Sequence, residues 1–232
     1  MLLVNKETKL FEVVIQEPAV ITVLSRFNIT LGVGDKSVKL VCEEHNLDTH
    51  FFLSILNTFI NPDYFPENAL KSYSTSEIID YLCKTNNYYR LFLIPNIEQH
   101  FNLLIMRSDS GNSNLELMRN FFYEVKAELL SRIDNDSSSL FAKITALQET
   151  KPLVNIANMK DKDIFSRDED STIEDKLNDL ISMFVIHLSG KYDANLCQAV
   201  LFAIINLKKD ICQNNRIRNK ILMPIYRALS IK

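Results

Sequence analysis

Apolar residues recur at helical spacing along most of the chain, and beyond residue 72 the runs become long. They predict four long helices, covering residues 74–107, 115–144, 173–187 and 193–229. Pro95 falls inside the first helix and should kink it. In chain order these helices predict an up-down-up-down four-helix bundle, with one long crossover formed by the polar residues 148–172.

Shorter apolar stretches fill the first 60 residues and predict several short helices, with apolar faces within 20–27, 38–42 and 51–59. Residues 61–66, Asn-Pro-Asp-Tyr-Phe-Pro, form a stiff connector after them. We therefore predict an all-α protein of two domains: a short N-terminal helical module, residues 1–62, and a four-helix bundle, residues 72–232.

Composition narrows the classes of protein that fit. The chain has 232 residues, 47% of them hydrophobic, and only four glycines, so no glycine-rich phosphate loop is present. The formal net charge of −3 argues against a nucleic-acid partner. No apolar run reaches the roughly 18–20 residues of a membrane span, and the first residues turn polar too early for a signal peptide. The four cysteines are widely spaced, and we expect them reduced in a cytoplasmic protein.

A faint internal repeat occurs in the second and fourth long helices. Arg132-x3-Asp136-x3-Leu140-Phe141-Ala142 has the same spacing as Asn214-x3-Arg218-x3-Leu222-Met223-Pro224. Polar residues four apart lie on one helix face. Such a pair would suit metal ligands if its members were His and Glu, and here they are neither.

Two stretches resemble the iron–sulfur cluster repair di-iron family, also described as regulators of cell morphogenesis and nitric-oxide signalling. The first is Val-Leu-Ser-Arg-Phe-Asn-Ile at 23–29, followed by 36–38 and 41–48, which is similar to the family's N-terminal helical module. The second is the bundle, ending in Arg-Asn-Lys-Ile-Leu-Met-Pro at 218–224, which resembles a hemerythrin-like domain. Together they cover nearly the whole chain.

The resemblance implies a di-iron site held by His and Glu from all four helices, but the ligand types are missing. The corresponding positions are Asn87, Ser108 or Asp109, Arg132, Asp136, Asp170, Asn214 and Arg218. Leu-Gly-Val-Gly at 31–34 stands where the family has adjacent cysteines. The four histidines are His45, His50, His100 and His187, none of which falls at an expected ligand position.

Arginine cannot ligate iron, so we expect no metal, no cofactor and no catalytic residue. We instead expect a polar, charge-compensated interior. Arg132 and Arg218 would face Asp136 and Asp170, with Asn87 and Asn214 satisfying the remaining donors, because an unpaired buried charge is costly. The other interpretation is that this end of the bundle has opened and these residues are solvated.

The sequence thus predicts a non-catalytic, metal-free relative of the repair proteins, acting as a regulatory or protein-interaction scaffold. Its partner would be a protein: a second copy or a metal-competent relative. One alternative is repair or nitric-oxide response through a different metal or thiol site. A weaker one is a small-molecule sensor in the vacated interior, which needs a pocket beside Asn87 and Asn214.

Three further features have two interpretations each. Cys83 and Cys212 are buried thiols or reactive ones, since Lys209 and Arg216 flank Cys212. The aromatic residues Tyr81, Tyr88, Tyr89 and Phe92 pack in the core or line a pocket. The basic last helix pairs with the acidic residues of 161–175 within the chain, or else binds nucleic acid; we expect the pairing.

Overall fold

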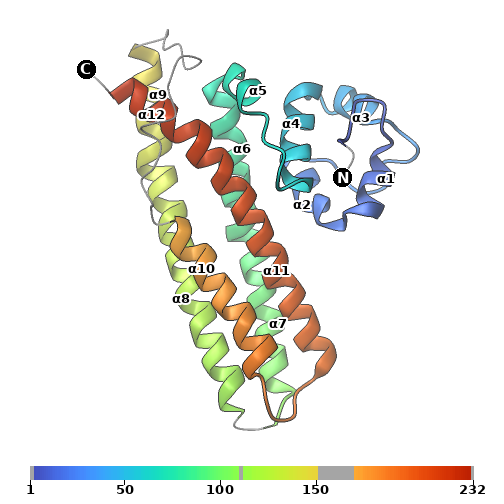
Figure 1. The fold of residues 1–232 in the computed structure, drawn as a ribbon, viewed down its shortest axis with the longest axis vertical. Helices are drawn as coiled ribbons and strands as arrows, with labels where there is room; N and C mark the ends of the chain where they lie inside the picture. Colours follow the sequence, from blue (N-terminus) through green and yellow to red (C-terminus); the bar gives the residue numbers. More distant parts are fainter. Residues whose placement is uncertain (1–2, 110–111, 151–169, 231–232) are drawn as a thin grey trace. The chain divides into compact units, whose positions relative to one another are not determined.

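The computed structural model describes residues 3–109, 112–150 and 170–230 (Figure 1). Every regular element within these ranges is a helix, and the extended backbone they contain is limited to one isolated bridge between Lys9 and Ser37. The all-α prediction is confirmed. None of the described helices is both long and apolar enough to cross a membrane.

The described chain forms two compact units. The first combines residues 3–84 with 216–230, and the second combines 85–150 with 170–215. Both α6 (Thr75–Tyr88) and α11 (Ala194–Ile217) pass from one unit to the other. This grouping differs from the predicted domains, 1–62 and 72–232, which follow chain order and stay a prediction.

The first unit contains the short helices that the N-terminal pattern predicts. They are α1 (Leu10–Gln16), a 3-10 turn η1 (Pro18–Val20), α2 (Ile21–Arg26), α3 (Val38–Glu44), α4 (Thr49–Ile60) and α5 (Glu67–Ser72), and the unit also holds η7 (Arg218–Leu222) and α12 (Met223–Ser230). Local chemistry fixes where α4 begins, because Asp48 caps it by accepting a 2.7 Å hydrogen bond from the Phe51 amide.

Aromatic rings form the core of the first unit. Phe27 contacts Phe51, Phe52 and Tyr81 edge-on or stacked, with ring centroids 5.1–6.2 Å apart. Arg26 is buried beside them and donates a 3.1 Å hydrogen bond to the Tyr81 hydroxyl. The Arg-Phe pair of the 23–29 stretch therefore connects α2 to α6.

Two asparagines end helices in the first unit. Asn28 and Asn46 have positive φ, 57° and 53°, directly after α2 and α3. The next residues, Ile29 and Leu47, donate their amides back to the carbonyls of Leu24 and Cys42, which is the Schellman pattern.

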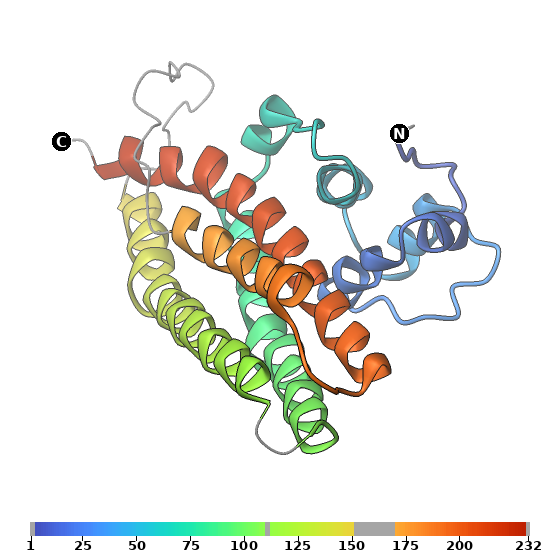
Figure 2. The same cartoon turned by 60° about the horizontal axis from the view of Figure 1, so that its bottom comes forward.

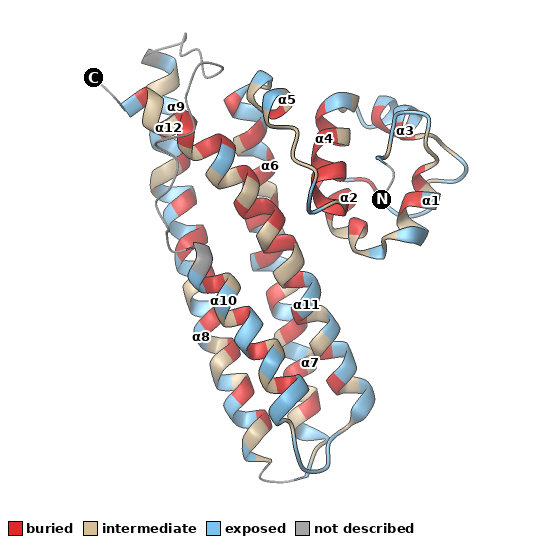
Figure 3. Cartoon of the chain, viewed as in Figure 1, coloured by how far each residue is buried: buried red, intermediate tan, exposed pale blue. Residues whose placement is uncertain are grey.

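The second unit is helical throughout its described residues. It holds η2 (Tyr89–Leu93), α7 (Ile94–Met106), α8 (Ser113–Asn135), η3 (Asp136–Leu140), α9 (Phe141–Thr150), α10 (Asp170–Ser182) and η6 (Met183–His187), with most of α11. One hydrophobic core takes side chains from α7, α8, α10 and α11. Helices α8 and α10 lie side by side (Figures 1 and 2), and buried residues recur along each helix (Figure 3).

Two short turns at one end of the second unit reverse the chain and are tied together. Asn112 Nδ2 donates to the Ser189 carbonyl at 2.9 Å, and Asn114 Nδ2 donates to the His187 carbonyl at 2.6 Å. Asn112 also caps α8 through its own side chain. The turn after α7 and the turn after η6 are therefore joined by hydrogen bonds at the same end of the second unit.

Five-residue π-helical stretches occur in the described helices: η2, η3 and η7 lie between α-helical segments, and η6 ends the run that begins with α10. Three of these stretches begin at Tyr89, Asp136 and Arg218 and end on leucine. The internal repeat seen in two helices thus has a third copy at 85–95, and its spacing coincides with a change in backbone conformation. The irregularity predicted at Pro95 lies one turn earlier: Pro95 itself is the second residue of α7, where its missing N–H costs little.

The asparagine caps generate a stability prediction. Asn28→Ala should lower the free energy of unfolding by about 1 kcal/mol, because alanine tolerates a left-handed backbone poorly. Asn28→Gly should leave it unchanged or raise it. Urea unfolding of the two variants measures the difference, and equal stabilities would contradict this account of the cap.

Candidate functional site

Polar side chains are concentrated inside the second unit, at the end far from the two tied turns. They come from the end of α6, from η2, α8, the start of η3, and α11. We call this cluster the polar interior; its members are Thr85, Asn86, Tyr89, Arg132, Asp136, Asp210, Gln213, Asn214 and Asn215, all buried. Burying this many polar side chains in a small helical unit costs free energy of folding unless they are hydrogen-bonded.

Helical spacing places several of these residues on the same face of their own helix, within one turn of each other. Asn86 and Tyr89 are three apart, and Arg132 and Asp136 are four apart, so each pair shares a helix face. On α11, Asp210 precedes Asn214 by one turn. Three members of the sequence repeat, Arg132, Asp136 and Asn214, are therefore buried here, whereas the fourth, Arg218, belongs to the first unit.

Asn214 links α11 to η2. Its Nδ2 donates to the Asp210 carbonyl oxygen at 2.8 Å, to Asp210 Oδ1 at 3.0 Å and to the Tyr89 hydroxyl at 3.0 Å. Its Oδ1 is buried and has no hydrogen-bond partner, and the same holds for Asn86 Nδ2, one helical turn before Tyr89. Within the described residues, these two amide atoms of the interior have no hydrogen-bond partner.

A second chain of hydrogen bonds joins α8, α11 and α10. Arg132 Nη1, in a side chain only 8% exposed, donates to Asn215 Oδ1 at 2.9 Å. Asn215 Nδ2 then donates to Glu174 Oε1 at 2.7 Å. The amide of Asn215 therefore relays between a buried cation and a carboxylate on α10.

Glu174 also holds the thiol of Cys212, whose Sγ donates to Oε2 at 3.1 Å. Burial, followed by this hydrogen bond and the charge of Glu174, raises the pKa of Cys212 to about 12. Burial and the hydrogen bond to Glu174 therefore favour the interpretation of Cys212 as a buried, protonated thiol, because the thiolate is the nucleophile.

A depression of about 490 Å³ opens beside Arg132. Its lining residues are Glu128, Ser131, Arg132, Asn135 and Ile173. Glu128 accepts 2.5 Å hydrogen bonds from Lys176 Nζ and the Thr172 hydroxyl, and these bonds lower the pKa of its carboxyl group. The rim of the depression thus carries a paired carboxylate at neutral pH.

The structure brings together three of the predicted site residues: Arg132, Asp136 and Asn214 are buried in the polar interior. Asn87 is exposed, so its predicted inward role is wrong. The neighbouring Asn86 is buried instead, which is a register error of one residue. Asn86 and Asn87 are adjacent in the sequence. Only their different directions around the helix axis determine which of them is buried.

The other predicted residues lie elsewhere. Ser108 and Asp109 are in the turn after α7, and since a helix rises about 1.5 Å per residue, the roughly 20 residues from Asn112 to Arg132 separate that turn from Arg132 by about 30 Å. Ser108 bonds the Leu104 carbonyl there. Arg218 is half-buried in the first unit, where it donates to Asn219 Oδ1. The side chain of Asp170 lies outside the described residues.

Sequence reasoning missed Glu174, Asn215 and Asp210. The last two had a usable signal, since Asp210 stands one turn before Asn214 and Asn215 directly follows it. Glu174 had none, because an acidic residue near the start of an amphipathic helix is ordinary on a solvent-exposed face.

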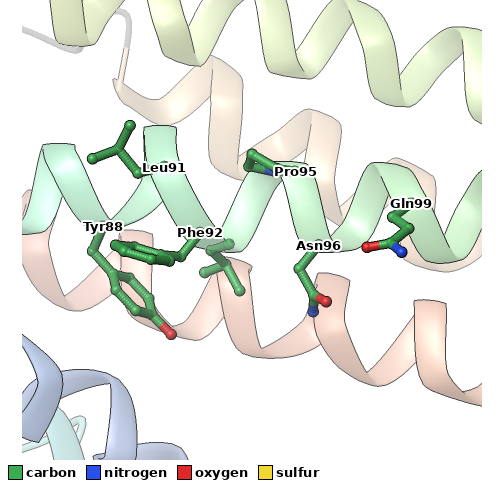
Figure 4. Close-up of a pocket in the computed structure, with 7 residues that line it drawn as sticks. Tyr88, Leu91, Phe92, Pro95, Asn96 and Gln99 are labelled. Carbon is green, nitrogen blue, oxygen red and sulfur yellow. The ribbon is translucent and has the colours of Figure 1, made fainter.

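The aromatic stretch divides between core and surface. Tyr81 and Tyr89 are buried in the first and second unit, respectively. Tyr88 and Phe92 lie on the surface of the second unit with Leu91 and Pro95, where they line a shallow depression of about 380 Å³ (Figure 4). The depression is therefore open to the surface and lies apart from the polar interior.

The polar interior lacks the imidazole and thiolate ligands that are typical of zinc centres and of the resembled di-iron centre. Its side chains are amides, hydroxyls, two carboxylates and a guanidinium. Across the described residues, no three His, Cys, Asp or Glu side chains gather closely enough to bind a metal. What the arrangement does instead is tie helices together through hydrogen bonds.

Comparison of the chain with protein-family models and with curated protein sequences gives no match. The resemblance to the di-iron repair family thus depends on the residues quoted above.

The burial of Asn86, Arg132 and Asn214 generates a prediction about metal binding. The triple variant Asn86→His, Arg132→His, Asn214→His should bind about one zinc ion per chain, since imidazole is a good zinc ligand and the buried cation is removed. Metal titration with a colorimetric zinc chelator measures the affinity.

The matched control places the first histidine at Asn87 instead of Asn86. This variant should bind zinc at least tenfold more weakly, because residue 87 faces solvent. Equal affinities of the two triple variants would contradict the register assigned to the interior.

A second prediction concerns the thiols. Glu174→Gln should lower the pKa of Cys212 and raise its alkylation rate, because it removes the negative charge that opposes thiolate formation. Cys197, whose pKa is raised by burial alone, is the internal control. Mass spectrometry after iodoacetamide treatment between pH 8 and 10 gives both rates; a Cys212 rate that does not change relative to Cys197 would refute the role of Glu174.

Proposed function

We propose that the protein is a non-catalytic, metal-free relative of the iron–sulfur cluster repair di-iron proteins, with a hemerythrin-like bundle that serves as a regulatory or protein-interaction scaffold. One observation carries the proposal: Arg132 and Asn214 stand at ligand positions of the resembled family and are buried in hydrogen bonds with Asn215, Asp210 and Tyr89. A buried guanidinium and hydrogen-bonded amides at these positions support the absence of a di-iron centre.

The energetics support a structural role for this interior. A hydrogen bond to a charged group typically contributes about 1.5–3 kcal/mol, so loss of the Asn215 acceptor should destabilise the buried Arg132. Such networks favour one packing arrangement over others in some proteins. A bundle that no longer carries a metal can keep its shape in this way, and a stable shape is what a scaffold requires.

The alternative of repair through a different thiol site has less support. Cys42 and Cys197 are buried, and burial raises the pKa of both thiols, that of Cys42 to about 11. Cys212 is hydrogen-bonded to Glu174. The small-molecule sensor has one favourable observation, the depression beside Arg132, although it lies beside neither Asn87 nor Asn214 as that interpretation requires.

The test is elemental analysis of untagged protein expressed in iron-replete medium, with mass spectrometry of small molecules released on denaturation. We expect iron below about 0.1 per chain and no stoichiometric small molecule. Near two irons per chain would overturn the proposal, and a stoichiometric small molecule would favour the sensor.

The partner is tested separately. Sedimentation velocity of the chain alone, and mixed with a metal-loaded member of the di-iron repair family, should reveal a dimer or a mixed complex. A monomer that binds neither itself nor the relative at micromolar concentrations would contradict the scaffold role.

A further inference from the structure

The connector at residues 61–66 is held against the C-terminal helical stretch within the first unit. Arg216 Nη2 donates a 2.9 Å hydrogen bond to the Tyr64 carbonyl. The Arg216 guanidinium carbon lies 5.1 Å from the centroid of the Phe65 ring, and Lys220 Nζ lies 5.0 Å from the same centroid. Residues about 150 positions apart in the chain are thereby joined by three contacts.

The connector is stiff enough to present Phe65 in one orientation. Asn61 accepts a 3.2 Å bond from the Asp63 amide through its side chain and a 3.1 Å bond from the Tyr64 amide through its carbonyl. Pro62 and Pro66 restrict the backbone on either side. Little conformational entropy is therefore left to lose when Phe65 binds the two cations.

The aromatic ring explains how two cations can lie so close. Arg216 and Lys220 are four residues apart across the junction of α11 and η7, a spacing at which like charges repel. The negative face of an aromatic ring attracts cations, and each such contact contributes about 0.5–2 kcal/mol. Asp63 adds a favourable charge near Arg216. Phe65 thus contacts both cations and offsets part of their mutual repulsion.

We propose that Tyr64, Phe65, Arg216 and Lys220 form a latch that fastens the N-terminal helices to residues 216–230. The connector is then a fixed strap in the first unit and not a swinging linker. Binding of a partner to the N-terminal helices would therefore change the local stability of the C-terminal helix. Binding at the C-terminal helix would likewise change that of the N-terminal helices. This coupling goes beyond the proposed scaffold role and stands whether or not the interior ever bound metal.

The experiment is hydrogen–deuterium exchange of the full chain in two variants, Phe65→Leu and Lys220→Met, which keep apolar bulk and remove the ring or the charge. Exchange should rise about fivefold in residues 64–70 and also in α12. Matched controls are Phe202→Leu, an exposed phenylalanine of the second unit, and Lys191→Met in an exposed turn. Both controls should leave these segments unchanged.

The double variant Phe65→Leu, Lys220→Met distinguishes a latch from general loosening. If Lys220 acts through the ring, the double variant exchanges no faster than Phe65→Leu alone. Additive effects, or a change in residues 64–70 without any change in α12, would overturn the proposal. Unchanged exchange in α2 and α3 verifies that each variant is folded, and a variant that loosens these helices as well argues against a local latch.

Discussion

The burial of one guanidinium constrains the second unit more than any other interaction. Arg132 is almost completely enclosed, cannot lose its charge at accessible pH, and must be given acceptors inside the protein. Asn215 supplies one, and Glu174 in turn orients Asn215 from α10. The hydrogen bonds that begin at this one side chain therefore hold three helices together. The Cys212 thiol, which donates to the same Glu174, is kept protonated.

This constraint explains why the interior can lack metal ligands without collapsing. In the resembled family, ligands from several helices would be tied through metal ions. In this chain, hydrogen bonds of 2.7–3.0 Å link α8, α10, α11 and η2 directly. Hydrogen bonds are individually weak, about 0.5–1.5 kcal/mol net, but leaving these groups unpaired would cost more. The network is thus maintained because breaking one of its hydrogen bonds would leave a buried polar group unpaired, which costs free energy.

The helices were predictable because apolar residues recur at regular helical spacing, both in the long helices and in the short N-terminal ones. The phase of a helix was harder to predict. Asn86 and Asn87 differ by 100° around the axis, and sequence alone did not show which one faces inward. The π-helical stretches that shift this phase leave a trace only as the shared spacing before Leu93, Leu140 and Leu222. The Glu174 link and the contacts at Phe65 depend on tertiary packing, which no local pattern encodes.

We propose that hydrogen bonds to Arg132 stand where the resembled family holds its metal centre. The most direct test is the free energy of unfolding of the unmodified chain in urea, measured anaerobically with and without excess ferrous iron. Binding to the native state alone would stabilise it by about 2.7 kcal/mol at a hundredfold excess over the dissociation constant. We predict no change on adding iron. A rise that saturates with iron concentration would contradict the account.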